Sequence, residues 1–248
     1  MITDITLSIN GLSCGYHKKE IVFVDELQLS KGDALTIAGG NGSGKSTFLR
    51  TLSGMLSPLR GSVEIDNRDL FKISSIERAR IVSLLLQVES ADCGLTVKEL
   101  VSLGRTPYLG RFGYFSKDDV KEVERSVELC DLKDIQDMPL DRISGGERQR
   151  ARLAMVLAQK TSLVLLDEPS NHLDFVHRQM LYNILENIRD DSGAIVVMVT
   201  HNLEDARRFA PRTLFLSSGK TSIFSRDQFE SLKDLIVKNT SLEKEWIY

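Results

Sequence analysis

The 248-residue sequence has no apolar stretch that approaches the roughly 20 residues needed by a membrane-spanning helix. Its first residues, Met-Ile-Thr-Asp, also lack the basic segment and apolar core that mark a secretion signal. From these absences we expect a cytosolic chain that reaches a membrane only when a partner tethers it.

Cysteine is scarce, and its three positions, Cys14, Cys93 and Cys130, lie far apart in the sequence. None of the spacings between them matches the short intervals of a metal-binding motif. We therefore expect free thiols in a reducing cytosol rather than a metal bound by cysteine.

The sequence also lacks an excess of positive charge, because 35 Asp and Glu outnumber 32 Lys and Arg, for a net charge of −3. The overall charge therefore does not indicate a nucleic-acid partner, although it does not exclude a local basic patch. The hydrophobic share of 42% and the charged share of 27% are ordinary for a globular protein. The length suits one large α/β domain with room for a subdomain.

A glycine-rich segment, Gly39–Thr47, organises the rest of the chain. It follows an apolar run at 34–38 and fits the phosphate-binding pattern of Gly, four residues, then Gly-Lys-Ser. Glycines at 42 and 44 would let backbone N–H groups surround a polyphosphate, and a helix beginning near Lys45 would add its positive end. Lys45 can reach the β- and γ-phosphates, and the Ser46 hydroxyl can bind Mg²⁺.

Apolar patterns predict a mostly parallel sheet with an antiparallel segment before it. Alternating apolar residues at 2–9 and 21–29 predict two antiparallel strands around a turn. Nearly continuous apolar runs predict buried parallel strands at 34–38, 81–86, 163–166 and 194–199. We expect a single α/β domain over 1–248, with the core at 1–87 and 161–248 and a helical subdomain at 88–160.

Capping patterns and apolar spacing predict the helices. Thr96 with Glu99 is a capping box, and Ser116 caps a helix with an expected stripe of Val120, Val123, Val127 and Cys130. A long helix is predicted from the apolar residues Phe175, Val176, Met180, Leu181, Ile184, Leu185 and Ile188. Two short strands around Gly219 and a capping box of Ser225 with Gln228 precede a terminal helix.

Polar residues follow three of the predicted buried strands: Gln87, Asp167, Glu168 and His201. Ligands of parallel sheets gather at the carboxyl ends of the strands, so we expect these side chains near the phosphate loop. Asp167 would hold Mg²⁺ directly or through water. Because side chains alternate along a strand, Glu168 would face another direction and act as general base for an attacking water. The alternative is a pair of surface acids.

Ser144-Gly145-Gly146-Glu147 precedes a predicted helix and suits an anion, since a serine at a helix start leaves backbone donors exposed. Taken alone, these residues fit an ordinary helix cap equally well. The longer stretch Ile143–Arg150 resembles the signature motif of ATP-binding cassette (ABC) ATPases, a family with a phosphate-loop NTPase core, an N-terminal antiparallel β subdomain and an inserted helical subdomain. The resemblance covers essentially the whole chain.

The resemblance implies an ATPase with ATP and Mg²⁺ as cofactors, and it assigns roles to residues of this sequence. The Walker A residues that bind ATP would be Gly39, Gly40, Asn41, Gly42, Ser43, Gly44, Lys45, Ser46 and Thr47. The catalytic set would be Glu168, His201, Lys45 and Gln87, and the Mg²⁺ ligands Ser46, Gln87 and Asp167. Further nucleotide contacts would come from Tyr16 on adenine, from Ser144, Gly145 and Gly146, and from Asp174 at the end of a D-loop that begins at Ser170.

Three residues depart from the commonest family pattern: Glu147 stands where glutamine is usual, Ile143 where leucine is, and Ser170 where threonine is. None removes a backbone N–H donor. In the family two cassettes pair head to tail, so the resemblance implies a homodimer whose two ATP sites each use the signature residues of the other copy. ATP binding would then close the pair and hydrolysis would reopen it.

The segment Leu95–Tyr108 resembles the corresponding stretch of importers of ferric siderophores, haem and cobalamin, above all in its Gly-Arg-x-Pro-Tyr element at 104–108. This resemblance implies separate permease subunits, a periplasmic or lipoprotein substrate-binding protein, and a place on the inner face of the cell membrane. The aromatic stretch 111–115 could receive a permease helix or pack within the subdomain.

Two other classes stay open: a soluble ABC ATPase serving another machine, such as iron–sulfur cluster assembly, and an exporter or lipid-extracting ATPase. A non-hydrolysing module is disfavoured because Glu168 and His201 are both present. The sequence does not name the cargo.

Overall fold

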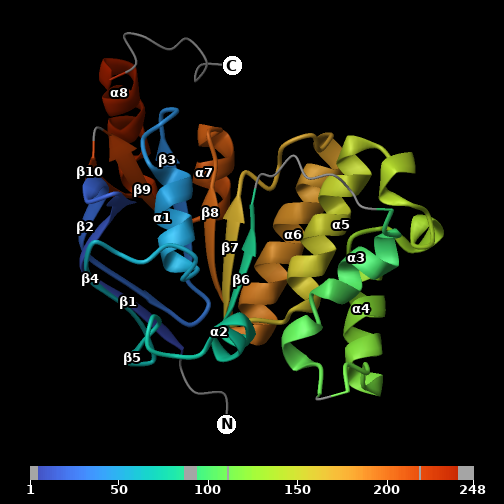
Figure 1. The fold of residues 1–248 in the computed structure, drawn as a ribbon. Helices are drawn as coiled ribbons and strands as arrows, with labels where there is room; N and C mark the ends of the chain where they lie inside the picture. Colours follow the sequence, from blue (N-terminus) through green and yellow to red (C-terminus); the bar gives the residue numbers. More distant parts are fainter. Residues whose placement is uncertain (1–4, 87–93, 111, 218, 240–248) are drawn as a thin grey trace.

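Two β-sheets and the helices that cover them form the chain (Figure 1). The computed structural model describes residues 5–86, 94–110, 112–217 and 219–239. Within these ranges, no helix combines the length and the apolar character that crossing a membrane requires.

The first sheet is antiparallel and has the order β2-β1-β4-β5. Its strands are β1 (Thr6–Tyr16), β2 (Lys19–Ser30), β4 (Arg60–Ile65) and β5 (Arg68–Asp69). The predicted antiparallel pair is confirmed, since Thr6 lies opposite Ser30 and Tyr16 opposite Lys19. The turn is tight because His17 and Lys18 both adopt positive φ.

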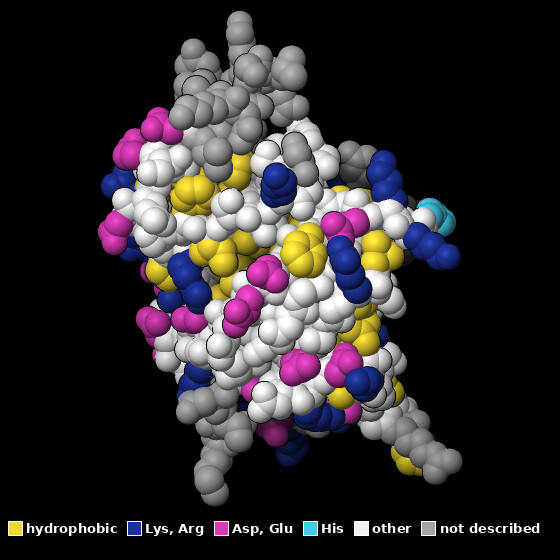
Figure 2. Space-filling model, turned by 90° about the vertical axis from the view of Figure 1, so that its left-hand side faces the viewer, with side chains coloured by type: hydrophobic (Ala, Val, Ile, Leu, Met, Phe, Trp, Pro, Cys, Tyr) yellow, Lys and Arg dark blue, Asp and Glu magenta, His cyan; other side chains and the backbone are white. Residues whose placement is uncertain are grey.

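The outer face of this region carries both signs of charge. Figure 2 shows acidic and basic side chains interspersed there, with apolar side chains between them. Arg60, for example, pairs with Glu20 at 2.9 Å and lies 5.5 Å from the centre of the Phe23 ring. Among the described residues of this face, the two signs of charge are mixed rather than gathered into a basic stripe.

The second sheet has the order β10-β9-β3-β8-β7-β6, and all its neighbouring strands are parallel except β10 and β9. Its strands are β3 (Ala34–Gly39), β6 (Val82–Leu85), β7 (Leu163–Asp167), β8 (Ile195–Val199), β9 (Arg212–Ser217) and β10 (Lys220–Ser225). Every residue of β3, β7 and β8 is buried. Helices or the other sheet cover both faces, which explains the continuous apolar runs.

Alternation along the strands divides the buried side chains between two hydrophobic cores. Leu163 and Leu165 of β7 face one core, which also contains Phe48 of α1 (Lys45–Leu52) and the antiparallel sheet. Val164 and Leu166 face the other core. Each side of the central sheet is thus built by every second residue of the same strand.

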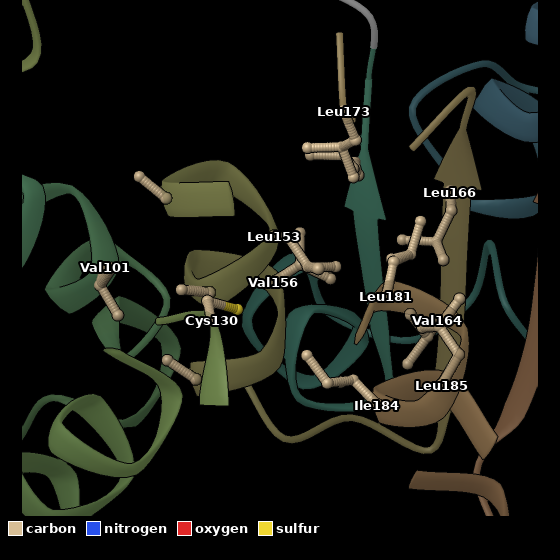
Figure 3. Packing of buried hydrophobic residues seen from close by; sticks show 14 of the residues in the cluster. Val101, Cys130, Leu153, Val156, Val164, Leu166, Leu173, Leu181, Ile184 and Leu185 are labelled. Atoms are coloured by element: carbon tan, nitrogen blue, oxygen red, sulfur yellow. The ribbon is translucent and has the colours of Figure 1, made fainter. Parts of the chain in front are cut away.

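The second core is covered by helices (Figure 3). They are α3 (Val97–Leu103), α4 (Lys117–Leu129), α5 (Gly145–Ala158) and α6 (Phe175–Ser192). Short 3₁₀ turns, η1 (Thr106–Tyr108), η2 (Lys133–Ile135) and η3 (Leu140–Arg142), connect them. Capping boxes begin α3, α4 and α5, and their first residues, Thr96, Ser116 and Ser144, are three at which the sequence predicts a cap.

Three further helices complete the fold: α2 (Ser75–Ile81), α7 (Leu203–Phe209) and α8 (Phe229–Asn239), the last preceded by the turn η4 (Arg226–Gln228). The helices α2 and α7 were not predicted. Both have only seven residues, and α2 buries none of its side chains, so it has no apolar stripe to recognise. Ile81 consequently belongs to the end of α2, and the strand begins at Val82.

The expected apolar stripe of α4 is wrong at Val120, which is 42% exposed; the long helix α6 is present as predicted, although Phe175 and Val176 in its first turn are 73% and 69% exposed. Val120 lies at the edge of a buried face made by Val123 and Val127. Phe175 and Val176 form the first turn of α6, which has 18 residues and spans about 27 Å. The five residues of β7 span only about 17 Å, so the helix extends past the strand that it covers.

A buried ion pair joins the helical segment internally. Arg105, after α3, donates from Nε to Asp119 Oδ1 of α4 at 2.8 Å, and the two side chains are 8% and 6% exposed. Arg105 Nη1 also donates to the carbonyl oxygen of Ala158 at 2.8 Å. Its guanidinium lies 3.8 Å from the centre of the Tyr108 ring.

The same cluster ties the helical segment to the central sheet. The Tyr108 hydroxyl donates to the carbonyl oxygen of Gln159 at 2.9 Å, just after α5. The Gln159 side-chain amide in turn donates to the carbonyl oxygen of Val82, the first residue of β6, at 3.0 Å. The Gly-Arg-x-Pro-Tyr element is therefore a structural joint between α3, α4, α5 and the sheet.

Asp119→Asn is expected to lower the free energy of unfolding by about 3 kcal/mol, because it leaves the buried Arg105 charge without its partner. Urea unfolding followed by circular dichroism measures this change. Asp118→Asn is the matched control: its side chain is 91% exposed, and a change within about 0.5 kcal/mol is expected. Equal stability of the two variants would contradict the role given to the ion pair.

Candidate functional site

The phosphate-loop segment connects β3 to α1. Gly44 precedes the first turn of α1 with φ 101°, and no side chain caps the helix there. An added Cβ at Gly44 would lie 2.2 Å from Val22 Cγ2 and 2.9 Å from Ile21 Cγ2. Only glycine fits this place, which brings the loop against β2 and leaves the N–H groups at the start of α1 for an anion.

Lys45 turns its ammonium group back into the loop. Its Nζ donates to the carbonyl oxygens of Gly39 and Gly40 at 2.7 and 3.0 Å, and the residue is 8% exposed. The Ser43 N–H donates to the same Gly40 carbonyl at 3.1 Å, which closes a tight turn. The positive charge therefore lies within the curve of the backbone, where a polyphosphate would be held.

Ser46 and Asp167 meet between α1 and the end of β7. The Ser46 side chain lies beside the Asp167 carboxylate, and Asp167 is 5% exposed. Burial raises the pKa of Asp167 above its usual range, and the charge of Glu168 adds to this effect, while Ser46 and Lys45 oppose it. A hydroxyl and a carboxylate are hard oxygen donors of the kind that Mg²⁺ prefers.

Within the described ranges, no three His, Cys, Asp or Glu residues come together as a metal site. A cation at Ser46 and Asp167, with Gln87 as the third predicted ligand, would take its further ligands from phosphate oxygens and water. That division is usual for Mg²⁺ in nucleotide sites, so the donor set fits the ion.

Glu168 follows β7 directly and adopts φ 51°, a left-handed conformation that is uncommon for a residue with a side chain. Its Oε1 lies 3.3 Å from Nδ1 of His201, and its Oε2 accepts a hydrogen bond from the Asn171 amide at 2.6 Å. The order β3-β8-β7 places the ends of these three strands side by side. This adjacency brings the phosphate loop, His201 and Glu168 to one edge of the sheet.

The expected reason for the different directions of Asp167 and Glu168 was strand alternation, and the structure gives another reason. Glu168 lies outside β7, whose last residue is Asp167. The left-handed turn at Glu168, not the pleat, directs its side chain toward His201 while Asp167 stays with Ser46.

The signature residues begin α5. Ser144 accepts from the Glu147 N–H at 3.2 Å, and the Glu147 carboxylate accepts from the Ser144 N–H at 2.7 Å. That backbone donor, followed by the Ser144 hydroxyl, lowers the pKa of Glu147. A glutamate in place of the usual glutamine thus completes the capping box, and Ser144 and Gly145 remain exposed.

The start of α5 contacts the residues after β7 rather than the phosphate loop of the same chain. An added Cβ at Gly146 would lie 3.1 Å from the His172 carbonyl oxygen, and the Gln149 amide donates to the Pro169 carbonyl oxygen at 3.2 Å. Figure 1 shows α1 and α5 on opposite sides of β7 and β6. The two expected anion sites are therefore separate within one chain.

Three expected site residues stand apart from this arrangement. Tyr16 ends β1 with its ring 37% exposed, and its hydroxyl accepts from Arg50 of α1 at 3.2 Å. Asp174 caps α6: its Oδ1 accepts from the His177 N–H at 2.9 Å, and its Oδ2 lies 2.8 Å from His177 Nδ1. Gln87 lies outside the described residues.

Two side chains near Glu168 were not predicted to contact it or to support it: Asn171, which was expected only as part of the D-loop, and Asp205. Asn171 lies in the expected D-loop, three residues after Glu168, and a polar side chain so soon after a strand-end acid was a usable signal. Asp205 offered no such signal, because the helix that contains it was not predicted and only the tertiary structure buries it, to 7% exposure.

Comparisons with known proteins agree with this geometry. The family model described as ABC transporter matches residues 24–171. The probable siderophore transport system ATP-binding protein YusV of Bacillus subtilis (strain 168) is 41% identical over 206 residues, which are 82% of this chain and 74% of that protein. The ferric enterobactin transport ATP-binding protein FepC of Escherichia coli (strain K12) is 37% identical over 88% of this chain and 82% of its own.

Among solved structures, the ATP-binding subunit of an ABC transporter superposes with a TM-score of 0.81 over 95% of this chain and 99% of its own. Its sequence identity is 22%, so this similarity concerns the fold alone.

Gly44→Ala is expected to weaken the binding of a fluorescent ATP analogue at least about tenfold, or ~1.4 kcal/mol, because the new methyl group would displace the loop from β2. Fluorescence titration gives the dissociation constant. Gly42→Ala is the matched control, since Gly42 also has positive φ, at 73°, but an added Cβ would meet nothing within 4 Å. If the two variants bound the analogue equally well, close packing at Gly44 would not be what shapes the loop.

Proposed function

This chain belongs to the ABC transporter family, and on that premise we propose that it is the ATP-hydrolysing motor of a bacterial importer of ferric siderophores or related metal chelates. The observation that supports hydrolysis best is Glu168, held between His201 and Asn171 beside the Ser46–Asp167 pair. The relatives support the cargo class, since they are named as ATP-binding proteins of siderophore and ferric enterobactin transport.

The phosphate loop would bind the nucleotide. The N–H groups at the start of α1 and the Lys45 ammonium would surround the β- and γ-phosphates, and Tyr16 would stack on the adenine. Ser46 and Asp167 would hold Mg²⁺, which when bound offsets charge on the phosphate oxygens. The burial of Asp167 beside Ser46 keeps the two oxygen donors next to each other before a nucleotide binds.

Glu168 would act as general base for the attacking water. Its two carboxylate oxygens contact different partners, His201 and Asn171, so the group is oriented rather than free to rotate. His201 is about half exposed and could reach the γ-phosphate on its other side.

A second copy of the chain would complete each site. The exposed N-terminus of α5, with Ser144 and Gly145, lies apart from α1 of the same chain. In a head-to-tail pair it would supply backbone N–H donors and a helix dipole to the γ-phosphate held by the partner copy. Asp174 then has an indirect part, since it caps the helix that follows the D-loop.

The importer proposal implies separate permease subunits and a substrate-binding protein, with the motor attached to the inner face of the membrane through the permease. The aromatic stretch at 111–115 was expected either to receive a permease helix or to pack within the subdomain, and two of its residues disfavour packing. Phe112 and Tyr114 are 83% and 81% exposed, and apolar groups of this size at a surface are typical of a contact site.

Glu168→Gln is expected to abolish ATP hydrolysis and to retain ATP-dependent dimerisation, because the amide keeps the shape of the side chain but cannot accept a proton from water. Phosphate release measures the first effect, and size-exclusion chromatography with and without ATP measures the second. Glu124→Gln, an exposed position on α4, is the control with unchanged activity. A Glu168→Gln protein that hydrolysed ATP normally would refute the mechanism.

The double substitution Phe112→Ser and Tyr114→Ser is expected to prevent co-purification with a metal-chelate permease expressed together with this chain. Phe175→Ser removes another exposed aromatic ring, 73% exposed, and should leave the complex intact. Affinity purification from detergent-solubilised membranes compares the two. If the chain ignored every metal-chelate permease and purified with a soluble scaffold instead, the alternative of a motor for another machine would replace the importer.

A further inference from the structure

Asp205, a buried carboxylate on α7, takes no part in the mechanism above. We propose that Asp205 is a positioning residue for hydrolysis, which ties together the two chain segments that orient Glu168. This inference rests on the proposed function of Glu168 as general base. It adds a residue that contacts neither the attacking water nor the phosphates but holds Glu168 in place.

Two separate segments orient Glu168. The first is the turn after β7, where the Asn171 amide donates to Glu168 Oε2 at 2.6 Å. The second is the end of β8, where His201 Nδ1 lies 3.3 Å from Glu168 Oε1. Each oxygen of the carboxylate therefore depends on a different segment, and a shift of either segment would rotate the base.

Asp205 connects these two segments behind Glu168. The Ser170 hydroxyl, next to Asn171 in the chain, donates to Asp205 Oδ2 at 3.4 Å. Asp205 lies four residues after His201. Both Ser170 and Asp205 are buried, at 9% and 7% exposure, so their contact is shielded from water.

The path from His201 to Asp205 is itself rigid. The Asn202 side chain caps α7 by accepting from the N–H groups of Glu204 and Asp205 at 2.9 and 3.2 Å. The Thr200 hydroxyl accepts from the Asn202 N–H at 3.0 Å. A displacement of Asp205 would therefore move the start of α7 and His201 with it.

Tyr182 of α6 closes the cluster. Tyr182 is 1% exposed and its ring lies 6.2 Å from the Phe209 ring of α7; among the described residues its buried hydroxyl, near Asp205, has no partner at hydrogen-bonding distance. Burial, and then the charge of Asp205, raise the pKa of Tyr182 far above its usual range, so the hydroxyl keeps its proton. A buried carboxylate is unfavourable unless polar groups bind it, and here the Ser170 hydroxyl and the Asn202-capped start of α7 hold Asp205 in place.

The contacts form a closed ring. It runs from Glu168 to Asn171 and through Ser170 to Asp205. From Asp205 it continues through the start of α7 and its cap to His201, which contacts Glu168 again. Because general-base catalysis depends on the placement of the base, and a 1 Å displacement reduces rate by about a hundredfold, the ring has a direct kinetic consequence. ATP affinity should depend on it much less, since none of its members belongs to the phosphate loop.

The test compares four variants in an ATPase assay. Asp205→Ala and Ser170→Ala should each lower kcat by about tenfold to a hundredfold, with the KM for ATP within about twofold of the parent. Asp205→Asn and Ser170→Thr keep an acceptor and a hydroxyl, so they should retain most of the rate. Glu204→Ala, at the exposed neighbouring position of α7, is the matched control and should leave kcat unchanged.

The double variant Ser170→Ala with Asp205→Ala gives the sharpest outcome. Because both residues act through one contact, its kcat should equal that of the slower single variant rather than the product of the two losses. A multiplicative loss, or a Ser170→Ala protein with parental kcat, would overturn the proposal. Thermal unfolding of each variant is measured in parallel, and a lower melting temperature with parental kcat would likewise overturn it.

Should Asp205→Ala fail to fold, Ser170→Ala and Ser170→Thr still decide the question, since they change only one small side chain. The outcome is also separable from the proposed function. Normal hydrolysis by Glu168→Gln would remove the function itself, whereas an inactive Glu168→Gln beside a fully active Ser170→Ala would remove only this inference.

Discussion

The approach of the Ser46 side chain to the buried Asp167 carboxylate is the contact on which the site depends. It joins the first turn of α1 to the end of β7, two elements that are more than a hundred residues apart in sequence. The remaining groups gather around it because β8 lies between β3 and β7 in the sheet. The phosphate loop, the two carboxylates after β7 and His201 thereby lie at one edge of the sheet, where the carboxyl ends of the parallel strands meet.

The same sheet explains why the residues after β7 lie on a packed core while the start of α5 is exposed. Leu163 and Leu165 of β7 pack toward α1, while Val164 and Leu166 pack toward the helices of the second core. The start of α5, in contrast, is exposed and contacts the turn after β7. An ATP site built from one chain would have the donors of α1 but not those of α5, which is the structural basis for proposing a pair.

Sequence patterns predicted the strands well because burial on both faces leaves a continuous apolar run, as in β7 and β8. They predicted the caps well because Thr96 and Ser144 bond to residues three positions away. They do not predict exposure, which distant contacts decide: Phe175 is apolar and at helical spacing, yet it is 73% exposed. The Gly-Arg-x-Pro-Tyr element resembled a marker of one importer class, and its Arg105 and Tyr108 proved to be parts of a buried joint.

The sequence by itself determined which groups are available: the glycines and Lys45 of the loop, the acids after β7, and the Ser-Gly-Gly start of a helix. These features are local, since turns, caps and strand ends involve residues close together in the chain. The tertiary structure alone decided how they combine. Glu168 faces His201 because of a left-handed turn, and Asp205 is buried beside Ser170 because α7 packs against the turn after β7. No short-range pattern encodes such contacts, because they depend on the order of strands in the sheet.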